Sequence, residues 1–228
     1  MPRPVRAIET IDSSPGRVSV PIRGKRFLDM VVSVTLLLVL ALPFFVIATL
    51  VALDLRAFPI FRGQRVGWKG EPFAIYKFRT MRRDYRPTRS AGDAEISFLH
   101  VPRDDPRITP LGKFLRRYSI DETPQLLNIF LGDMSLIGPR PFDAEEFEQG
   151  PFPDPGYHEW LRKRHWVRPG MAGLWQVSGR NDTSFADLVA LDLKYVQEWT
   201  PGLECSIFWR TFGGWYVGPA RVELRSAC

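Results

Sequence analysis

MVVSVTLLLVLALPFFVIATLVAL, residues 30–53, is a run of 24 residues without a charged side chain. As a helix, this run is long enough to cross a hydrocarbon core of about 30 Å. It is longer than the apolar core of a typical secretory signal peptide, and no small-x-small cleavage site follows it. We therefore interpret it as a membrane element, the only segment of membrane scale in the chain.

Basic residues flank this run equally on both sides. Orientation across a membrane depends on a difference in basic residues between the two flanks, and here no difference exists. Equal flanks are expected when both ends of the segment stay at the same, cytoplasmic, face. The basic residues are Arg17, Arg23, Lys25 and Arg26 before the run, and Arg56, Arg62, Arg65 and Lys69 after it.

Pro43 lies inside the apolar run and predicts a bend or break there, because proline removes a backbone hydrogen bond and clashes with the preceding turn. A helix-break-helix hairpin would enter one leaflet and return, provided that the freed backbone groups near Leu42 find partners. The alternative is a kinked transmembrane helix, in which proline is tolerated. The pattern leaves both alternatives open.

The overall composition excludes some functional classes. The chain has 228 residues and a formal charge of +6, which favours polyanionic partners such as nucleic acid, anionic lipid or phosphorylated substrates. Cys205 and Cys228 are the only cysteines, so no disulfide framework is expected. The three histidines have no metal-ligand spacing with either cysteine, which argues against a zinc site.

The middle of the chain predicts three elements. Residues 75–81 alternate apolar and basic side chains, which predicts a half-buried strand with Lys77 and Arg79 on one face. This pair either binds an anionic ligand or protects a sheet edge by its charge. Residues 82–106 predict a long loop. Residues 111–118 predict a short amphipathic helix, which lies on a membrane surface or packs against a core.

Two more elements are expected near the C-terminal end. Residues 184–199 predict a helix with Ser184 as N-cap and one apolar face. Residues 207–217 are dense in Phe and Trp, which is typical of an element at a membrane interface. The apolar face of the first helix consists of Leu188, Leu191, Tyr195 and Trp199.

Two adjacent carboxylates, Asp121 and Glu122, precede Pro124 and an apolar run. One explanation is helix capping, because acidic residues in a first turn interact favourably with the helix dipole. Pro124 favours a helix that starts between residues 121 and 123, with the proline in its first turn. The free N–H groups of this helix end, with Arg116 nearby, would attract phosphate and keep an aspartate ionised.

An ionised aspartate can act as a nucleophile toward phosphorus, and a divalent ion held by the second carboxylate would neutralise charge on the phosphoryl oxygens. Mg²⁺ is the natural ion for a site of carboxylates and phosphates. Further along, the rigid turn Gly138-Pro-Arg140-Pro141 either presents Arg140 to a phosphate with little loss of entropy or is a plain turn with an exposed arginine.

Several motifs, in order within residues 23–218, together resemble the bacterial sugar transferases, the monotopic polyprenyl-phosphate phosphoglycosyl transferase family. They are Lys25-Arg-Phe-Leu-Asp29, Tyr76-Lys-Phe-Arg-Thr-Met81, Asp105-Pro-Arg-Ile-Thr109, Asp121-Glu-Thr-Pro-Gln-Leu126, Gly132-Asp-Met-Ser-Leu-Ile-Gly-Pro-Arg-Pro141 and Gly173-Leu-Trp-Gln-Val-Ser-Gly-Arg180.

The resemblance implies transfer of a sugar 1-phosphate from a UDP-sugar to undecaprenyl phosphate, at the cytoplasmic face of the bacterial inner membrane. This reaction begins the assembly of an exopolysaccharide, a capsule or another surface glycan. The resemblance also implies that Asp121 is the nucleophile, which forms a covalent aspartyl phosphosugar and releases UMP, and that Glu122 is a ligand of Mg²⁺.

The same resemblance assigns phosphate binding to Lys77, Arg116 and Arg140, and the break of a re-entrant helix to Pro43. Arg79, on the predicted face of Lys77, is a further substrate-binding candidate. The chain departs from the family pattern at Leu42, where Ser is frequent, at Thr123, where Leu is more usual, and at Glu204, where Asp is typical. Glu204 is assigned no role, and Asp192 is a weak candidate.

The expected architecture is mainly α with minor β. It comprises a flexible N-terminal tail (residues 1–22), a re-entrant membrane helix hairpin (23–57) and a small cytoplasmic, membrane-surface catalytic domain with interfacial amphipathic helices (58–228). The expected partners are a UDP-sugar, undecaprenyl phosphate and anionic membrane lipids, and a homo-oligomer is compatible with the sequence. A non-catalytic basic membrane-surface adaptor would also fit the charge, whereas no known nucleic-acid-binding motif is present.

Overall fold

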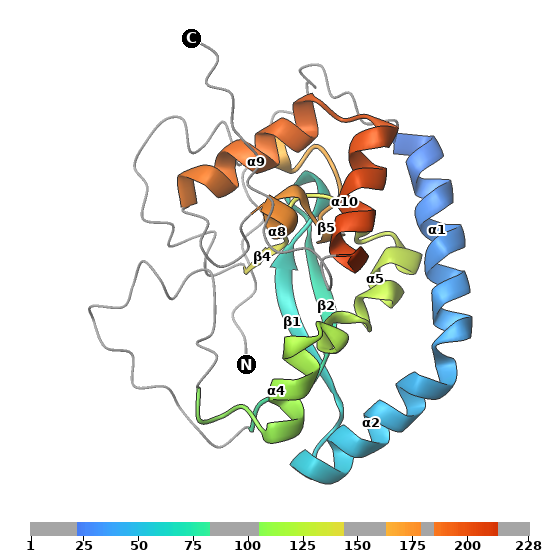
Figure 1. Cartoon of the computed structure of the whole chain (residues 1–228), viewed down its shortest axis with the longest axis vertical. Coiled ribbons are helices and arrows are strands. Elements are labelled where there is room, and N and C mark those ends of the chain that lie inside the picture. Colours follow the sequence, from blue (N-terminus) through green and yellow to red (C-terminus); the bar gives the residue numbers. More distant parts are fainter. Residues whose placement is uncertain (1–21, 83–104, 144–162, 179–184, 214–228) are drawn as a thin grey trace.

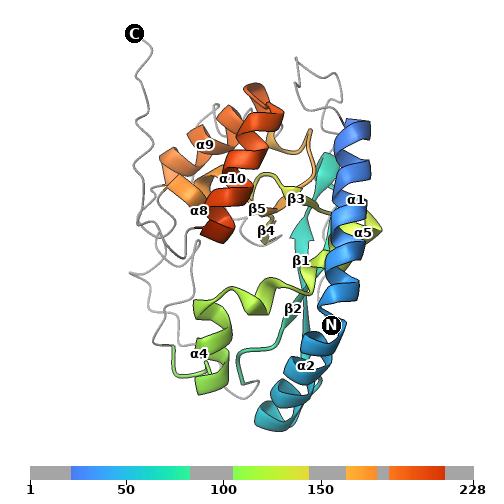
Figure 2. The same cartoon turned by 45° about the vertical axis from the view of Figure 1, so that its right-hand side comes forward.

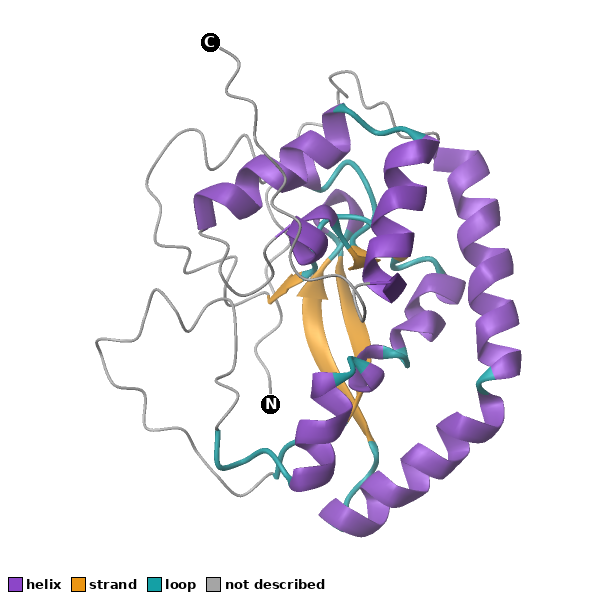
Figure 3. Cartoon of the chain, in the orientation of Figure 1, coloured by secondary structure: helices purple, strands orange, loops and turns teal. Residues whose placement is uncertain are grey.

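The computed structural model describes residues 22–82, 105–143, 163–178 and 185–213. Within these ranges the protein is mainly helical with short strands (Figure 1, Figure 3), which confirms the predicted fold class at this level. Several predictions concern residues outside these ranges. They are the N-terminal tail up to residue 21, nearly all of the loop of residues 82–106, the N-cap Ser184, and the end of the aromatic element, residues 214–217.

The helices bear the labels used in Figure 1. They are α1 (Ile22–Val39), α2 (Ala41–Leu55), α4 (Pro110–Arg117), α5 (Gln125–Leu131), α8 (Leu174–Ser178), α9 (Phe185–Gln197) and α10 (Pro201–Gly213), with short 3₁₀ turns η1 (Trp68–Gly70) and η2 (Ile120–Glu122). The strands are β1 (Ile60–Val66), β2 (Pro72–Phe78), β3 (Ser135–Ile137), β4 (Phe142–Asp143) and β5 (Gly170–Ala172).

The apolar run forms α1 and α2, which are bent by 65° relative to each other (Figure 2). Among the described residues, no single helix has the length and apolar composition to cross a bilayer, whereas this bent pair meets both criteria together. The break is at Leu40, three residues before Pro43, which lies in the first turn of α2. Its position has a direct cause: Pro43 has no N–H to donate to the carbonyl of Val39, the residue at which α1 ends.

Leu40, the residue at the break, keeps both of its backbone hydrogen bonds. The Leu40 amide donates to the Leu36 carbonyl over 2.8 Å, and the Phe44 amide donates to the Leu40 carbonyl over 2.8 Å. These bonds need no side-chain hydroxyl at position 42, so the replacement of Ser by Leu42 is compatible with the bend.

The central hairpin of β1 and β2 carries the first apolar core. The two strands pair antiparallel along their whole length, from Ile60 opposite Phe78 to Val66 opposite Pro72, and β4 pairs with the other edge of β1. α5 lies between this hairpin and α1 (Figure 1). The buried side chains at this contact, which α1 and α2 partly cover, are Phe73, Ile75, Leu126, Ile129 and Met134.

A second apolar core lies where α8, α9 and α10 pack near the parallel pair β3 and β5. Leu188, Leu191 and Tyr195 are buried in it, which confirms the predicted apolar face of residues 184–199. Residues 207–213 of the predicted interfacial element form the second half of α10, in which Ile207 is fully buried and Trp209 is 71% exposed. The placement of this element at a membrane interface stays a prediction.

α4 packs against a core on one side. Leu115 is buried with Val51 of α2 and Phe78 of β2, whereas Phe114 is 53% exposed, and contact of α4 with a membrane surface stays a prediction. Thr109 caps the helix by accepting a hydrogen bond from the Gly112 amide over 3.0 Å. This packing places the basic last turn of α4 beside η2.

Candidate active site

The two adjacent carboxylates lie on η2, a turn between α4 and α5. The predicted helix start between residues 121 and 123 is wrong, because α5 begins at Gln125 with Pro124 at its N-cap position. Ser119, which precedes η2, has a left-handed φ of 54° and makes no side-chain cap hydrogen bond. Asp121 is buried, with 9% of its surface exposed.

Lys77 reaches this turn from β2. Its Nζ donates to Oε1 of Glu122 over 2.7 Å, and about a quarter of each side chain is exposed. An ion pair that borders solvent contributes little to stability, so an anionic ligand can compete for the lysine at small cost. The structure therefore joins two of the predicted site residues directly.

Arg116 approaches the same carboxylates from the last turn of α4. Its Nε donates to Oγ1 of Thr80 over 2.9 Å, which holds the half-buried guanidinium against the segment after β2. Burial lowers the pKa of Arg116, while the charge of Asp121 opposes this effect. Three segments thus place Lys77, Arg116 and the two carboxylates together.

Burial raises the pKa of Asp121 to about 6, and the adjacent charge of Glu122 acts in the same direction. The charges of Lys77 and Arg116 favour the ionised form and lower the pKa. Near neutral pH the carboxylate is therefore ionised but poorly solvated. This state is suited to a nucleophile that must leave its hydration shell to react.

Arg79 bonds to the segment that precedes β1. β2 ends at Phe78, one residue before Arg79, so the expectation that both basic residues lie on one strand is wrong. The Arg79 amide donates to the Pro59 carbonyl over 2.7 Å, and its Nε donates to the Phe58 carbonyl over 3.0 Å. These bonds anchor Arg79 to the segment that follows α2.

Arg140 belongs to the second core. Its guanidinium carbon lies 4.9 Å from the centre of the Trp175 ring, and its carbonyl accepts a hydrogen bond from Arg164. Arg164 in turn pairs with the buried carboxylate of Asp192 over 3.1 Å. Asp192, a weak candidate from the sequence, thus supports the segment that bears Arg140.

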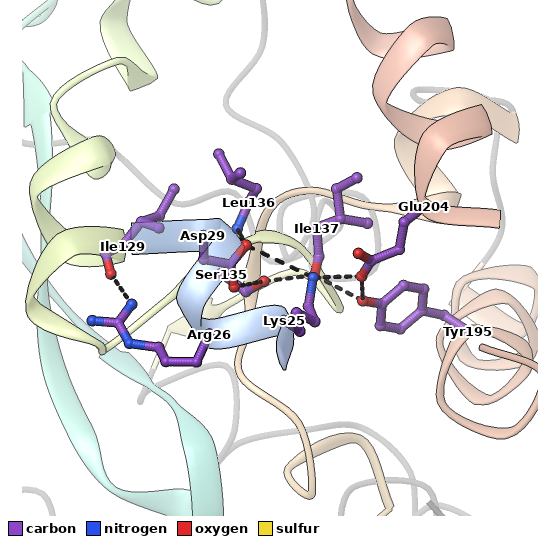
Figure 4. Close-up of polar contacts among 9 residues, drawn as sticks. All are labelled: Lys25, Arg26, Asp29, Ile129, Ser135, Leu136, Ile137, Tyr195 and Glu204. Atoms are coloured by element: carbon purple, nitrogen blue, oxygen red, sulfur yellow. Dashed lines mark hydrogen bonds and ion pairs between the residues drawn. The ribbon is translucent and has the colours of Figure 1, made fainter. Parts of the chain in front are cut away.

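A polar cluster links the start of α1 to β3 and α10 (Figure 4). Asp29 accepts hydrogen bonds from the Ser135 hydroxyl over 2.7 Å and from the Leu136 amide over 3.1 Å. Lys25 lies 3.8 Å from Asp29 and also donates to Glu204. Sequence reasoning assigned Glu204 no role, and the structure makes it the partner of Lys25.

Sequence reasoning also missed Asn128. It is a fully buried amide in the otherwise apolar Leu-Leu-Asn-Ile-Phe-Leu segment of α5. A lone polar residue in an apolar run is a signal that could have identified it, since buried polar groups need hydrogen-bond partners.

The adjacent carboxylates provide a donor set that fits Mg²⁺ when a substrate supplies phosphate oxygens, because this ion is usually held by one or two carboxylates plus phosphate and water. Glu122 is the more accessible of the two carboxylates. In the part of the chain that the structure describes, no group of three or more His, Cys, Asp or Glu side chains is arranged to hold a metal ion. Protein side chains of these ranges alone therefore do not form a closed metal cage.

Comparison of the amino-acid sequence with known proteins identifies relatives of this chain. The exopolysaccharide production protein ExoY of Sinorhizobium fredii is 37% identical over 200 residues, which cover 84% of this chain and 85% of ExoY. The undecaprenyl-phosphate galactose phosphotransferase of Salmonella typhimurium is 37% identical over 208 residues, which cover 88% of this chain. The UDP-galactose-lipid carrier transferase of Erwinia amylovora is 36% identical over 196 residues, which cover 83% of this chain.

The extent of these matches differs. The alignments cover only 40% of the Salmonella protein and 39% of the Erwinia protein. A family model for bacterial sugar transferases matches residues 21–217, a range that includes α1, α2 and all the candidate site residues. The chain therefore belongs to the bacterial sugar transferase family.

Proposed function

We propose that this protein transfers a sugar 1-phosphate from a UDP-sugar to undecaprenyl phosphate and so initiates the assembly of an exopolysaccharide or another surface glycan. The observation that carries the proposal is the convergence of Lys77 and Arg116 on Asp121 and Glu122. The names of the Salmonella and Erwinia relatives, which include undecaprenyl phosphate and UDP-galactose, support the same substrates.

In the first step, a carboxylate oxygen of Asp121 attacks the phosphorus that bears the sugar. A bond forms between this oxygen and phosphorus, and the bond from phosphorus to the bridging oxygen breaks, so UMP leaves with the bridging oxygen and its electron pair. Lys77 and Arg116 bind the phosphate oxygens and compensate their charge. Glu122 would hold Mg²⁺, which neutralises charge on the phosphoryl oxygens when it is bound.

In the second step, an oxygen of undecaprenyl phosphate attacks the same phosphorus. The bond between phosphorus and the Asp121 oxygen breaks, which restores the carboxylate and yields the lipid diphosphate sugar. Two successive displacements allow a water-soluble donor and a membrane-bound acceptor to use one site in turn. The acceptor phosphate lies in the headgroup plane, so the nucleophile must be held at that depth.

We also propose that α1 and α2 form the re-entrant hairpin of a monotopic protein at the cytoplasmic face of the bacterial inner membrane. Their 65° bend and their equal basic flanks support this placement. Large apolar side chains of both helices are exposed, and a surface of this kind is typical of contact with lipid. The most exposed are Leu38, Val39, Leu42, Phe45 and Leu53, each at least 68% exposed.

The reaction is tested by incubating purified protein with Mg²⁺, undecaprenyl phosphate and each member of a panel of UDP-sugars, and measuring UMP. One donor is expected to release UMP, and in a parallel incubation without undecaprenyl phosphate the same donor is expected to leave a phosphosugar on Asp121, detected by mass spectrometry of a digest. Asp121→Asn is expected to abolish both signals and to keep membrane association. A non-catalytic adaptor predicts instead that wild type and this variant behave alike with every donor.

A further inference from the structure

Asn128 connects α5 to an edge of the central sheet. Its Oδ1 accepts a hydrogen bond from the Tyr76 amide over 3.0 Å, and its Nδ2 donates to the Ala74 carbonyl over 2.7 Å. Among the residues that the structure describes, β2 pairs with β1 on one side only, because the strand order of this sheet is β2-β1-β4. The amide of Asn128 therefore bonds backbone groups of β2 as a neighbouring strand would.

The orientation of this amide is determined by its partners. Nδ2 also donates to Oδ2 of Asp133 over 3.2 Å. A flipped amide would place its oxygen against two acceptors and its nitrogen against the Tyr76 N–H, which loses all three bonds. The Asn128 carbonyl meanwhile accepts from the amides of Gly132 and Asp133, each over 3.0 Å, at the end of α5. Asn128 is thus bonded on both its side chain and its backbone.

The apolar contact between α5 and β2 does not by itself specify their register. Ile75 packs with Leu126 and Ile129, but hydrophobic contact is non-directional and tolerates small displacements. Hydrogen bonds are directional and lose strength steeply when their geometry changes. The bonds of Asn128 to residues 74 and 76 therefore restrict the sliding of α5 along β2.

This restriction acts on the candidate active site, because the same two segments carry its reacting groups. Lys77 follows Tyr76 on β2, and Glu122 lies six residues before Asn128. We infer that Asn128 is a positioning residue, which sets the register in which Lys77 meets Glu122 and Asp121. The inference rests on the function proposed above, because it concerns the rate of aspartyl phosphosugar formation.

Asn128→Ala is expected to slow this first step by about 100-fold, because a misplacement of about 1 Å is sufficient for such a loss. The matched control is Val196→Ala, which shortens a fully buried side chain in the second core, outside the contact between α5 and β2. This control is expected to lower the melting temperature and to change the rate by less than about threefold. Single-turnover UMP release measures the rate, and tryptophan fluorescence measures unfolding.

A double-mutant cycle distinguishes positioning from a general loss of stability. If Asn128 acts by placing Lys77, then Asn128→Ala is expected to slow a Lys77→Met protein far less than it slows wild type. If the rate loss of the double variant equals the product of the losses of the two single variants, the inference is overturned. A rate for Asn128→Ala equal to that of Val196→Ala would also overturn it. If Asn128→Ala does not fold, Asn128→Asp replaces it under the same criteria, since a carboxylate keeps the size but cannot donate to Ala74.

The two proposals fail in different ways. Wild-type protein that releases no UMP from any donor overturns the proposed function, and the positioning role of Asn128 with it. Wild-type protein that releases UMP, together with an Asn128→Ala protein as fast as the control, overturns the positioning role alone.

Discussion

Lys77 Nζ lies 2.7 Å from Glu122 Oε1, although 45 positions separate the two residues in the chain. The contact joins the end of the central hairpin to the turn that bears the candidate nucleophile. It places a cation next to two carboxylates, of which one is buried and the other about a quarter exposed. The chemistry proposed for this protein depends on that charge balance.

The first prediction concerns the pH dependence of UMP release. Asp121 must be ionised to attack phosphorus, and its pKa in the free protein is raised to about 6. The value of kcat/KM is therefore expected to fall by about tenfold per pH unit below this value, because kcat/KM reports groups of the free enzyme. Lys77 lowers the pKa of Asp121, so Lys77→Met is expected to move the acid limb to higher pH.

Lys69→Met is the matched control for this shift. It removes the same charge from the turn at the other end of the hairpin, where Lys69 stacks on Trp68. An acid limb that moves equally in both variants, or that moves to lower pH in Lys77→Met, would contradict the assignment of Asp121 as the titrating nucleophile.

The second prediction concerns the bend between α1 and α2. Pro43→Leu supplies an N–H that can donate to the Val39 carbonyl, so the helix is expected to straighten across the break. A straight helix of this length can cross the bilayer, which would move one flank to the outside. The side on which each flank lies is measured by its reaction with a membrane-impermeant maleimide. For this purpose a single cysteine replaces Val20 or Phe58 in a protein that lacks Cys205 and Cys228.

If α1 and α2 form a re-entrant hairpin, neither cysteine is expected to react in intact cells, and both are expected to react after permeabilisation. With Pro43→Leu added, one of the two positions is expected to react in intact cells. Reaction of only one position without this substitution would show that α1 and α2 cross the membrane, which refutes the re-entrant placement.

The third prediction concerns the cluster of Lys25, Asp29 and Glu204. Lys25→Met leaves the buried Asp29 and the largely buried Glu204 without their shared cation, so it is expected to cost about 3–5 kcal/mol of unfolding free energy. Glu204→Gln leaves Lys25 beside Asp29 and preserves a hydrogen-bonding group, so about 1 kcal/mol is expected. Thermal unfolding in lipid nanodiscs measures the stability of both variants. Equal losses of stability in the two variants would argue against Lys25 as a shared cation.

The fourth prediction concerns Asp192. Burial raises its pKa to about 6 although Arg164 opposes this, whereas the unfolded chain has an ordinary value of about 3.9. A raised folded pKa means that the folded state binds the proton more tightly. The contribution of this carboxyl to stability is therefore complete below about pH 4 and is lost as pH rises through about 6.

Asp192→Asn removes this dependence. The stability of wild type relative to this variant is expected to increase as pH falls from 7 to 4, by up to about 1.4 kcal/mol per pH unit. Melting temperatures of the two proteins across this range measure the difference. A difference that is constant with pH, or that changes in the opposite direction, contradicts the raised pKa.

Local patterns in the sequence were sufficient to predict several elements. The apolar face of Leu188, Leu191 and Tyr195 follows from helical periodicity, and α9 buries all three. The apolar run predicted a bent element around Pro43, because a missing N–H acts on its own helix. The Asp121-Glu122 motif, together with the other ordered motifs, was sufficient to identify the family.

The sequence by itself thus determined several element types, the family and the residue types proposed to react, since each depends on neighbours along the chain. Only the tertiary structure decided that Lys77 meets Glu122 while Arg79 bonds to Phe58, and that Lys25 meets Glu204 across 179 positions. These pairings depend on how helices and strands pack. A side chain's partner across such a contact is chosen by distance and burial in the folded molecule, which no local periodicity encodes.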